Sequence, residues 1–414
     1  MTDAGSGLRR IKRLWNSPTL RSVVVYGASG AGFAGANLLL AYELPRQEYA
    51  LFTLVLALVN LAAPASPVGL DALVLRRRLE VGSLLFRRLL LVSSLVTLLF
   101  VLVGDVVYHL APWLLVLVAV SSIGGAVMAV AGARFQSEQR FGLALSLTQS
   151  PNIVLMVAAL AAWMEGWKTA WPALFISALG YATAAIVGWS IVRRDHAYGR
   201  NAPGSFPWGE ALALAGLDAS GLLLVQLDRL VIPWLLPLSA LALYGVLSAI
   251  AGSVFRVLQM AVGYALIPRL RAAESIERRR RLIRHETLLV TALMVAGALA
   301  VSVAVPLVQQ FLLHDKYELS APLVLAVVVS GVAKVLNAFA KALVAGLALP
   351  DEVATVNLFG WLSVAAAIAA AAVGARWGLA GVIYGVGFGW LMRALVAFRI
   401  CARHLRTVEP LRAA

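Results

Sequence analysis

The sequence predicts an all-α polytopic membrane protein, with about twelve transmembrane helices in two six-helix lobes related by a pseudo-two-fold axis along the membrane normal. Hydrophobic residues make up 61% of the 414 residues, and charged residues only 13%. Apolar stretches recur from end to end between short polar breaks. Because a helix needs about 20 apolar residues to cross a bilayer, and lipid offers no partners for backbone polar groups, each stretch is expected to be a helix.

The apolar stretches themselves set the expected limits of the helices. We expect spans at residues 20–42, 49–73, 86–106, 110–131, 142–163, 171–192, 209–233, 239–267, 287–312, 320–346, 353–374 and 378–400. The breaks between them are short, and the longest one, on the inner side, runs from about residue 268 to 286. None of the breaks has room for a soluble catalytic domain.

The basic residues predict the orientation of the chain. The breaks after odd-numbered spans hold only four of the 35 Lys and Arg residues: Arg46, Lys168, Lys316 and Arg376. Most of the others lie in the even-numbered breaks and in the two terminal tails. Cytoplasmic loops carry an excess of Lys and Arg. We therefore expect a multi-pass protein of the inner (plasma) membrane with both termini in the cytoplasm, and the net charge of +15 does not indicate a nucleic-acid partner.

A weak internal repeat divides the chain into equal halves. Leu44-Pro45 and Leu236-Pro237 are each followed by a similar Ala-Leu-aromatic segment at the same offset of 192 residues. Because each half has six spans, both halves enter the membrane from the same side, as in transporters built from parallel repeats. We expect a cytoplasmic tail at 1–19, lobes at 20–200 and 201–402, and a second tail at 403–414.

Ionisable residues within the spans are the strongest pointers to function, because they are costly in lipid and usually face a bundle interior or a wet cavity. Arg256 and Gln259 lie on one face of span eight. Lys334, Asn337 and Lys341 lie on one face of span ten, at helical spacing. These five residues form a candidate cationic chamber for an anionic group, since Arg and Lys both bind phosphate.

The acidic residues of span seven leave a second interpretation open. Asp218, Asp228 and Arg229 are candidates for structural ion pairs or for a coupling site that binds a proton or cation. Asp228 with Arg229 or Arg256, and Asp218 with Lys341, would neutralise one another. Arg393, in the inner part of span twelve, is interpreted as interfacial.

Chemical motifs that would indicate an enzyme are missing from the sequence. We find no His-Glu-x-x-His, no Walker loop and no Gly-x-Ser-x-Gly. The single cysteine, Cys401, excludes internal disulfides and cysteine-rich metal sites. We therefore expect no enzyme activity, no catalytic residue, no metal and no cofactor.

Residues of the span-seven to span-eight hairpin carry a family resemblance. The segment 226–232, followed by Leu236, Ala240 and Leu243-Tyr244-Gly245-Val246, resembles this hairpin in polysaccharide flippases of the multidrug/oligosaccharidyl-lipid/polysaccharide exporter superfamily. Asn357 in span eleven and the segment 377–382 in span twelve are weaker echoes. Pro233 and Pro237 depart from the family's hairpin, where more flexible residues are usual.

The resemblance implies a flippase that moves undecaprenyl-pyrophosphate-linked oligosaccharides from the cytoplasmic to the outer leaflet by alternating access. It implies glycosyltransferases and a polymerase of the same pathway as partners, and leaves coupling to Na⁺ or H⁺ open. One alternative is a multidrug cation antiporter of the same superfamily, although the first half has no carboxylate near mid-membrane. A membrane enzyme of polysaccharide assembly is the second alternative.

Overall fold

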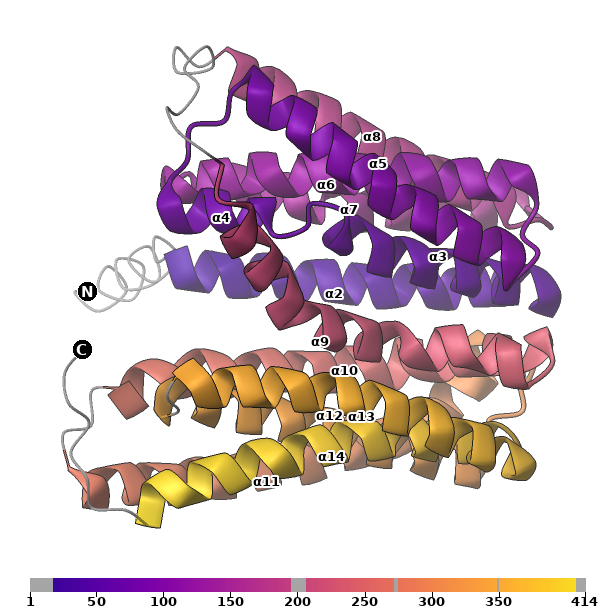
Figure 1. The fold of residues 1–414 in the computed structure, drawn as a ribbon. Coiled ribbons are helices and arrows are strands. Elements are labelled where there is room, and N and C mark those ends of the chain that lie inside the picture. The colour runs from indigo at the N-terminus through magenta and orange to yellow at the C-terminus, as the bar shows by residue number, and fades with distance from the viewer. Residues whose placement is uncertain (1–17, 195–205, 272–274, 348–349, 407–414) are drawn as a thin grey trace, which may run out of the picture. The chain divides into compact units, whose positions relative to one another are not determined.

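The computed structural model describes residues 18–194, 206–271, 275–347 and 350–406, and within these ranges it contains helices and turns but no strand (Figure 1). The chain divides into two compact units, Met1–Ala215 and Gly216–Ala414, which are described separately. The predicted lobe boundary at 200/201 falls among residues outside the described ranges, whereas the limit between the units lies inside a helix, α9 (Trp208–Leu235).

Unit 1 is organised around one central helix. Its helices are α2 (Pro18–Glu43), α3 (Arg46–Ala65), α4 (Leu70–Arg77), α5 (Ser83–Val106), α6 (Pro112–Ser137), α7 (Phe141–Glu165) and α8 (Trp171–Arg193). Helix α6 packs against α3, α4, α5, α7 and α8, and α2 packs against α7. Small residues allow these close contacts: a Cβ atom on Gly125 would lie 2.4 Å from the Cβ of Ala63.

The second expected span, 49–73, is wrong as a single helix. Helix α3 ends at Ala65, and the short α4 begins only at Leu70. Pro67 cannot donate the next helical hydrogen bond because proline lacks a backbone N–H, and Val68 leaves the helical region with a φ of +48°. Gly69 completes the turn with a φ of +74°, and a side chain there would collide with the backbone oxygen of Ala211.

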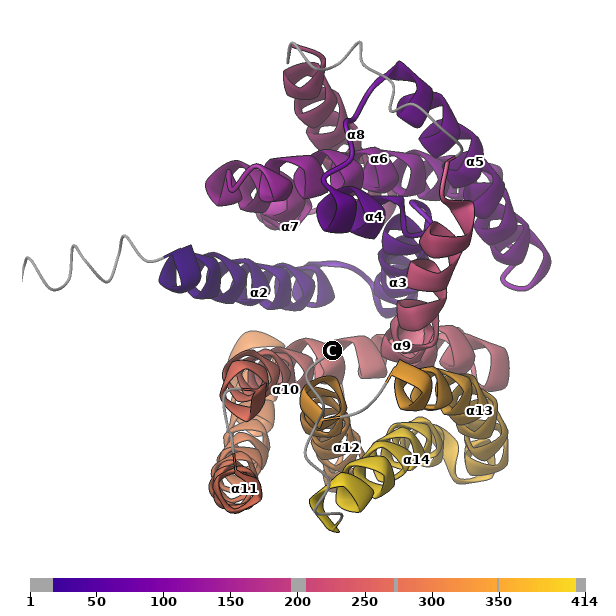
Figure 2. The ribbon, with the colours of Figure 1, turned by 60° about the vertical axis from the view of Figure 1, so that its left-hand side comes forward.

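Unit 2 holds the remaining long helices. They are the rest of α9, α10 (Leu238–Arg271), α11 (Ile276–Leu307) with a π turn η1 (Val308–Leu312), α12 (Ala321–Leu347), α13 (Pro350–Gly374), the short η2 (Ala375–Trp377) and α14 (Gly378–Arg406). Figure 2 shows α10 to α14 nearly end-on. Helix α12 packs between α10 and α14, with α11 beside α10 and α13 beside α14.

The long inner break expected at 268–286 is wrong, because most of it is helical. Helix α10 continues to Arg271, and α11 already begins at Ile276, three turns before the expected start of its span. The Ser275 hydroxyl caps α11 by accepting a hydrogen bond from the backbone N–H of Arg278, at 3.2 Å. This cap satisfies one of the free N–H groups at the helix start, so the basic segment after it is helical.

Helix packing supports the internal repeat. In unit 1, α8 packs on α6 and α7, while α6 packs on α3 and α5. In unit 2, the helices six spans later, with the short α4 not counted, make the same four pairs: α14 packs on α12 and α13, while α12 packs on α10 and α11. Five helices of each half therefore share these four pairings, which is what the internal repeat in the sequence predicts.

Length and hydropathy single out nine candidate membrane spans among the described residues, or ten if the two bent parts of α9 count as one. One of the nine, Ala354–Arg403, covers both α13 and α14. Side chains on the outer stripe of α5 are strongly exposed, with Leu91 at 64% and Leu98 at 54%. Such apolar stripes mark membrane surfaces, and the prediction of an all-α membrane protein with twelve long helices in two halves is confirmed.

Candidate functional site

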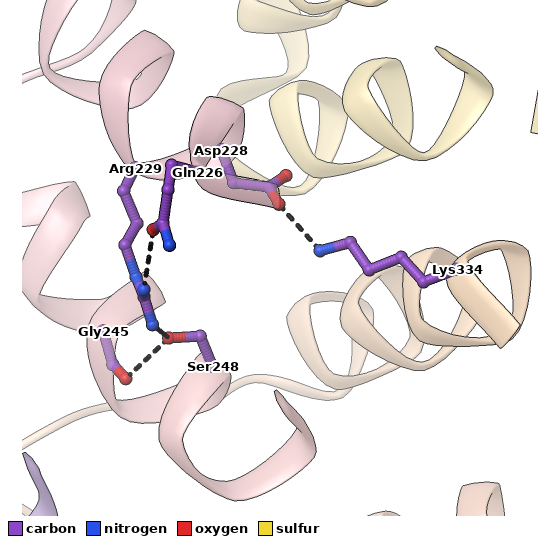
Figure 3. A network of polar contacts seen from close by, with 6 residues as sticks. All are labelled: Gln226, Asp228, Arg229, Gly245, Ser248 and Lys334. Atoms are coloured by element: carbon purple, nitrogen blue, oxygen red, sulfur yellow. Dashed lines mark hydrogen bonds and ion pairs between the residues drawn. The ribbon is translucent and has the colours of Figure 1, made fainter. Parts of the chain in front are cut away.

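An ion pair between α9 and α12 is largely buried in unit 2. The carboxylate Oδ2 of Asp228 lies 2.8 Å from the Nζ of Lys334 (Figure 3). Asp228 is only 1% exposed, and the Lys334 side chain is 20% exposed. Removing either charge from a buried pair leaves the other uncompensated in a medium of low dielectric. The pair therefore holds the two helices in one register.

Arg229 belongs to a separate group of contacts, because neighbouring residues point about 100° apart around a helix. Its guanidinium donates to the Oε1 of Gln226 at 3.0 Å and to the hydroxyl of Ser248 at 3.1 Å. The Ser248 hydroxyl in turn donates to the carbonyl of Gly245 at 3.0 Å. Arg229 thus links α9 to α10 (Figure 3).

The structure corrects one expected pairing. Asp228 pairs with Lys334, and neither Arg229 nor Arg256 is its ion-pair partner within the described ranges. Tyr244 on α10 also interacts with the Asp228 carboxylate. The side chain of Asp218 lies outside the described residues, so its expected pairing with Lys341 stays a prediction.

Two of the predicted chamber residues lie on an open face of α10. Arg256 is exposed and Gln259 is half-buried. Gly252, one turn before Arg256, would meet nothing within 4 Å if it carried a Cβ atom. This face of α10 therefore presents the guanidinium of Arg256 next to free space at Gly252.

The predicted residues of α12 differ in their surroundings. Lys334 is engaged by Asp228, Asn337 is buried at 7% exposure, and Lys341 is exposed. Helical spacing places them on one side of α12, but packing against α9, α10 and α14 covers that side unevenly along its length. Lys341 thus joins Arg256 as an exposed cation of the predicted chamber.

A neutral polar cluster in unit 1, here called the amide cluster, consists of Ser29 on α2 with Gln149 and Asn152 on α7. Ser29 donates to the Oε1 of Gln149 at 2.7 Å, and the Nδ2 of Asn152 donates to the Ser29 hydroxyl at 2.8 Å. Gln149 and Asn152 stand out in the sequence as polar residues within an expected span, but no site was assigned to them, and Ser29 was not a candidate. The run of polar side chains around Pro151 in an otherwise apolar helix was the available signal.

A buried arginine lies among α9, α13 and α14. Arg393 is 5% exposed, so its expected interfacial position is not what the structure shows. Its guanidinium lies against two glycines. A Cβ atom on Gly221 would be 3.2 Å from the guanidinium, and one on Gly360 would be 3.5 Å from it. Ser220, fully buried beside Gly360, completes the surroundings. The two glycines provide the space that this large side chain needs.

Comparisons with known proteins give a consistent result for the fold. No family model matches the sequence, and no curated protein does. A multidrug resistance MATE family transporter of the MOP superfamily in an inward-facing conformation aligns with a TM-score of 0.64 at 12% identity, covering 93% of this chain and 96% of that one. The lipid II flippase MurJ aligns at 0.58 and 9% identity, covering 91% and 86%.

A third solved structure, an outward-facing MATE family transporter of the MOP superfamily, aligns with a TM-score of 0.55 at 15% identity over 95% of this chain and 97% of that one. At such low identity, these likenesses concern the fold alone. They extend over nearly the whole chain, both halves included. The chain therefore has the twelve-helix, two-lobe fold of the MATE transporters and of MurJ.

Proposed function

We propose that the chain is a flippase that translocates an oligosaccharide linked to undecaprenyl pyrophosphate, or a similar anionic lipid-linked precursor, by alternating access. The observation that carries this proposal is the exposed Arg256 on the open face of α10. A pyrophosphate accepts bidentate hydrogen bonds from a guanidinium. Lys341, also exposed, would add a second charge, and Lys334 would reach the anion only by leaving Asp228.

The balance of charge supports an anionic substrate over a cationic drug. Among the described side chains of α9, α10 and α12, there are four cations within the spans, Arg229, Arg256, Lys334 and Lys341. The described carboxylates are Asp228, which Lys334 engages, and Glu210 in the first turn of α9, which pairs with Arg77. In unit 1, the described carboxylates lie in helix ends and turns, and mid-helix polar groups are neutral. A site for cations needs negative charge, whereas positive side chains outnumber negative ones among these described residues.

Transport in proteoliposomes tests the proposal. Purified protein would be reconstituted with undecaprenyl-pyrophosphate disaccharide placed in one leaflet, and a lectin outside would report the sugar that emerges. We expect wild-type protein to accelerate emergence, and Arg256→Ala to slow it about tenfold or more, because hydrogen bonds to charged groups are among the stronger ones. Arg278→Ala is the matched control, since Arg278 is an exposed arginine at the start of α11.

The same vesicles separate the two transport functions. If wild-type protein moves no lipid but exports a cationic dye under a proton or Na⁺ gradient, the flippase proposal is wrong and a multidrug antiporter takes its place. If both Arg256→Ala and Arg278→Ala flip lipid at the wild-type rate, Arg256 is not the phosphate site.

A further inference from the structure

The amide cluster of unit 1 is held in a fixed orientation by its own hydrogen bonds. Ser29, only 7% exposed, donates to Gln149 and accepts from Asn152. The Nδ2 of Asn152 also approaches the Oε1 of Gln149 at 3.3 Å. The buried hydroxyl thus anchors both amides, which are half-buried. Groups held in this way need little reordering to bind a ligand.

Each amide leaves one end unused. The nitrogen of Gln149 and the carbonyl oxygen of Asn152 have no hydrogen-bond partner in the part of the chain that the structure describes. Exchanging the nitrogen and oxygen of both amides would still leave one donor and one acceptor. The cluster therefore presents a donor and an acceptor side by side.

The position of the cluster along its helices makes these free ends informative. Ser29 lies eleven residues from the start of α2, and Gln149 and Asn152 lie eight and eleven residues from the start of α7. At 1.5 Å per residue, this places them about 12–17 Å along each helix, at the depth of the hydrocarbon. Unpaired polar groups are costly there. They are therefore expected to face water or a polar ligand.

Space for a ligand exists beside the cluster on α2. A Cβ atom on Gly27, Gly30 or Gly32 would meet nothing within 4 Å. Gly32 lies three residues after Ser29, on the same face of the helix, and Ala28 and Ala31 are exposed. The cluster therefore borders a surface without bulky side chains.

The internal repeat offers a comparison within the same chain. Gly221 of unit 2 stands 192 residues after Ser29, the offset of the repeat. At this place in unit 2, the guanidinium of Arg393 packs against Gly221 and Gly360. Unit 2 fills the position with its own side chain, whereas in unit 1 the amides have free ends beside open space.

We propose that Ser29, Gln149 and Asn152 bind the uncharged sugar of the lipid-linked substrate, through its hydroxyl or acetamido groups. Such groups present a donor and an acceptor close together, and neutral amides complement both without a charge. This inference rests on the proposed function and adds to it a contact for the sugar within unit 1. The amide cluster is a specificity site, since it would sense the sugar and not the carrier.

Binding to purified protein in nanodiscs tests this assignment with two probes, undecaprenyl pyrophosphate and the same lipid carrying an N-acetylhexosamine disaccharide. The test variants are the double substitution Gln149→Met, Asn152→Leu, which removes the polar ends, and Gly32→Leu, which leaves the cluster intact but fills the space beside it. Ser190→Ala is the control, because this exposed hydroxyl of α8 donates to the carbonyl of Val187 at 2.8 Å.

We expect both test variants to weaken binding of the disaccharide lipid about tenfold, with binding of the sugarless lipid and thermal unfolding unchanged. Equal affinity of the wild-type protein and both variants for the disaccharide lipid would overturn the sugar site, and so would an equal loss for both lipids. If the wild-type protein binds neither lipid, the proposed function itself fails. The two failures are therefore distinguishable.

Discussion

Lys334 on α12 and Asp228 on α9 form a buried ion pair, with 2.8 Å between Nζ and Oδ2, although 106 residues separate them in the sequence. The other carboxylate oxygen of Asp228 is buried and has no hydrogen-bond partner within the described residues. The lysine is therefore the main compensation for this charge. The pair competes with any role of Lys334 in binding an anion, so its energetics bear directly on mechanism.

Removing Lys334 should destabilise the protein more than removing the whole pair. Lys334→Met leaves the Asp228 carboxylate buried and uncompensated, which typically costs about 3–5 kcal/mol. The double substitution Asp228→Asn, Lys334→Met removes both charges and should restore most of the stability. Thermal unfolding of the detergent-solubilised variants measures the difference. Lys341→Met, at an exposed position of α12, is the control.

Additive effects of the two single substitutions would contradict this prediction. A double-mutant cycle isolates the coupling between the residues. A coupling energy near zero would mean that the solubilised protein does not form this ion pair.

Gly331 on α12 should tolerate no side chain, because the ring of Phe255 on α10 fills the space beside it. A Cβ atom there would lie 2.2 Å from Phe255 Cδ2, and Phe255 is 2% exposed. We expect Gly331→Ala to cost about 1–3 kcal/mol through overpacking. Gly252→Ala on α10 is the matched control, since its Cβ atom meets nothing within 4 Å.

Gly252→Ala should leave the stability of the protein unchanged or raise it, because alanine has a higher helix propensity than glycine by about 1 kcal/mol. Unfolding temperatures of the two variants measure the contrast. The addition of Phe255→Leu to Gly331→Ala should recover part of the loss. Equal stability of the two glycine variants would show that α10 and α12 pack differently.

The sequence was sufficient to predict the helices, because the thickness of the bilayer sets a length that each apolar stretch must meet. The prediction of the helix limits failed where a proline or a capping residue, and not hydropathy, sets the end of a helix. Pro67 divides the second span into α3 and α4, and the Ser275 cap starts α11 within a basic segment.

Contacts between helices were harder to predict than the helices. Sequence proximity favoured Arg229 or Arg256 as the partner of Asp228, but the rotation of α12 brings Lys334 to it instead. Arg393 was placed at the interface, whereas α14 continues to Arg406, past the expected end at residue 400, and Arg393 lies buried. Such pairings depend on how side chains fit between helices, which hydropathy does not encode.

Arg229 should be poorly replaced by lysine. Its guanidinium donates to two acceptors on different helices, Gln226 at 3.0 Å and Ser248 at 3.1 Å. Lysine keeps the charge but lacks the planar fork that reaches both. We expect Arg229→Lys to lose at least one hydrogen bond from a charged group, which is worth about 1.5–3 kcal/mol. Ser248→Ala should cost less, because Arg229 keeps its bond to Gln226.

Thermal unfolding in detergent compares the two variants. If Arg229→Lys is as stable as the wild-type protein while Ser248→Ala is not, the planar fork is not what stabilises this contact.

Cysteine labelling in intact cells should reveal the predicted orientation, with both termini in the cytoplasm. The only native cysteine, Cys401, is 2% exposed, so the unmodified chain should give little background with a membrane-impermeant maleimide. One pair of exposed positions is available in each unit: Lys168 and Arg140 in unit 1, and Arg376 and Arg278 in unit 2. Because basic residues accumulate on the cytoplasmic side, Lys168→Cys and Arg376→Cys should react in intact cells, whereas Arg140→Cys and Arg278→Cys should react only after permeabilisation. The opposite labelling pattern in both units would mean that the membrane topology is inverted. Opposite patterns in the two units would contradict the parallel repeat.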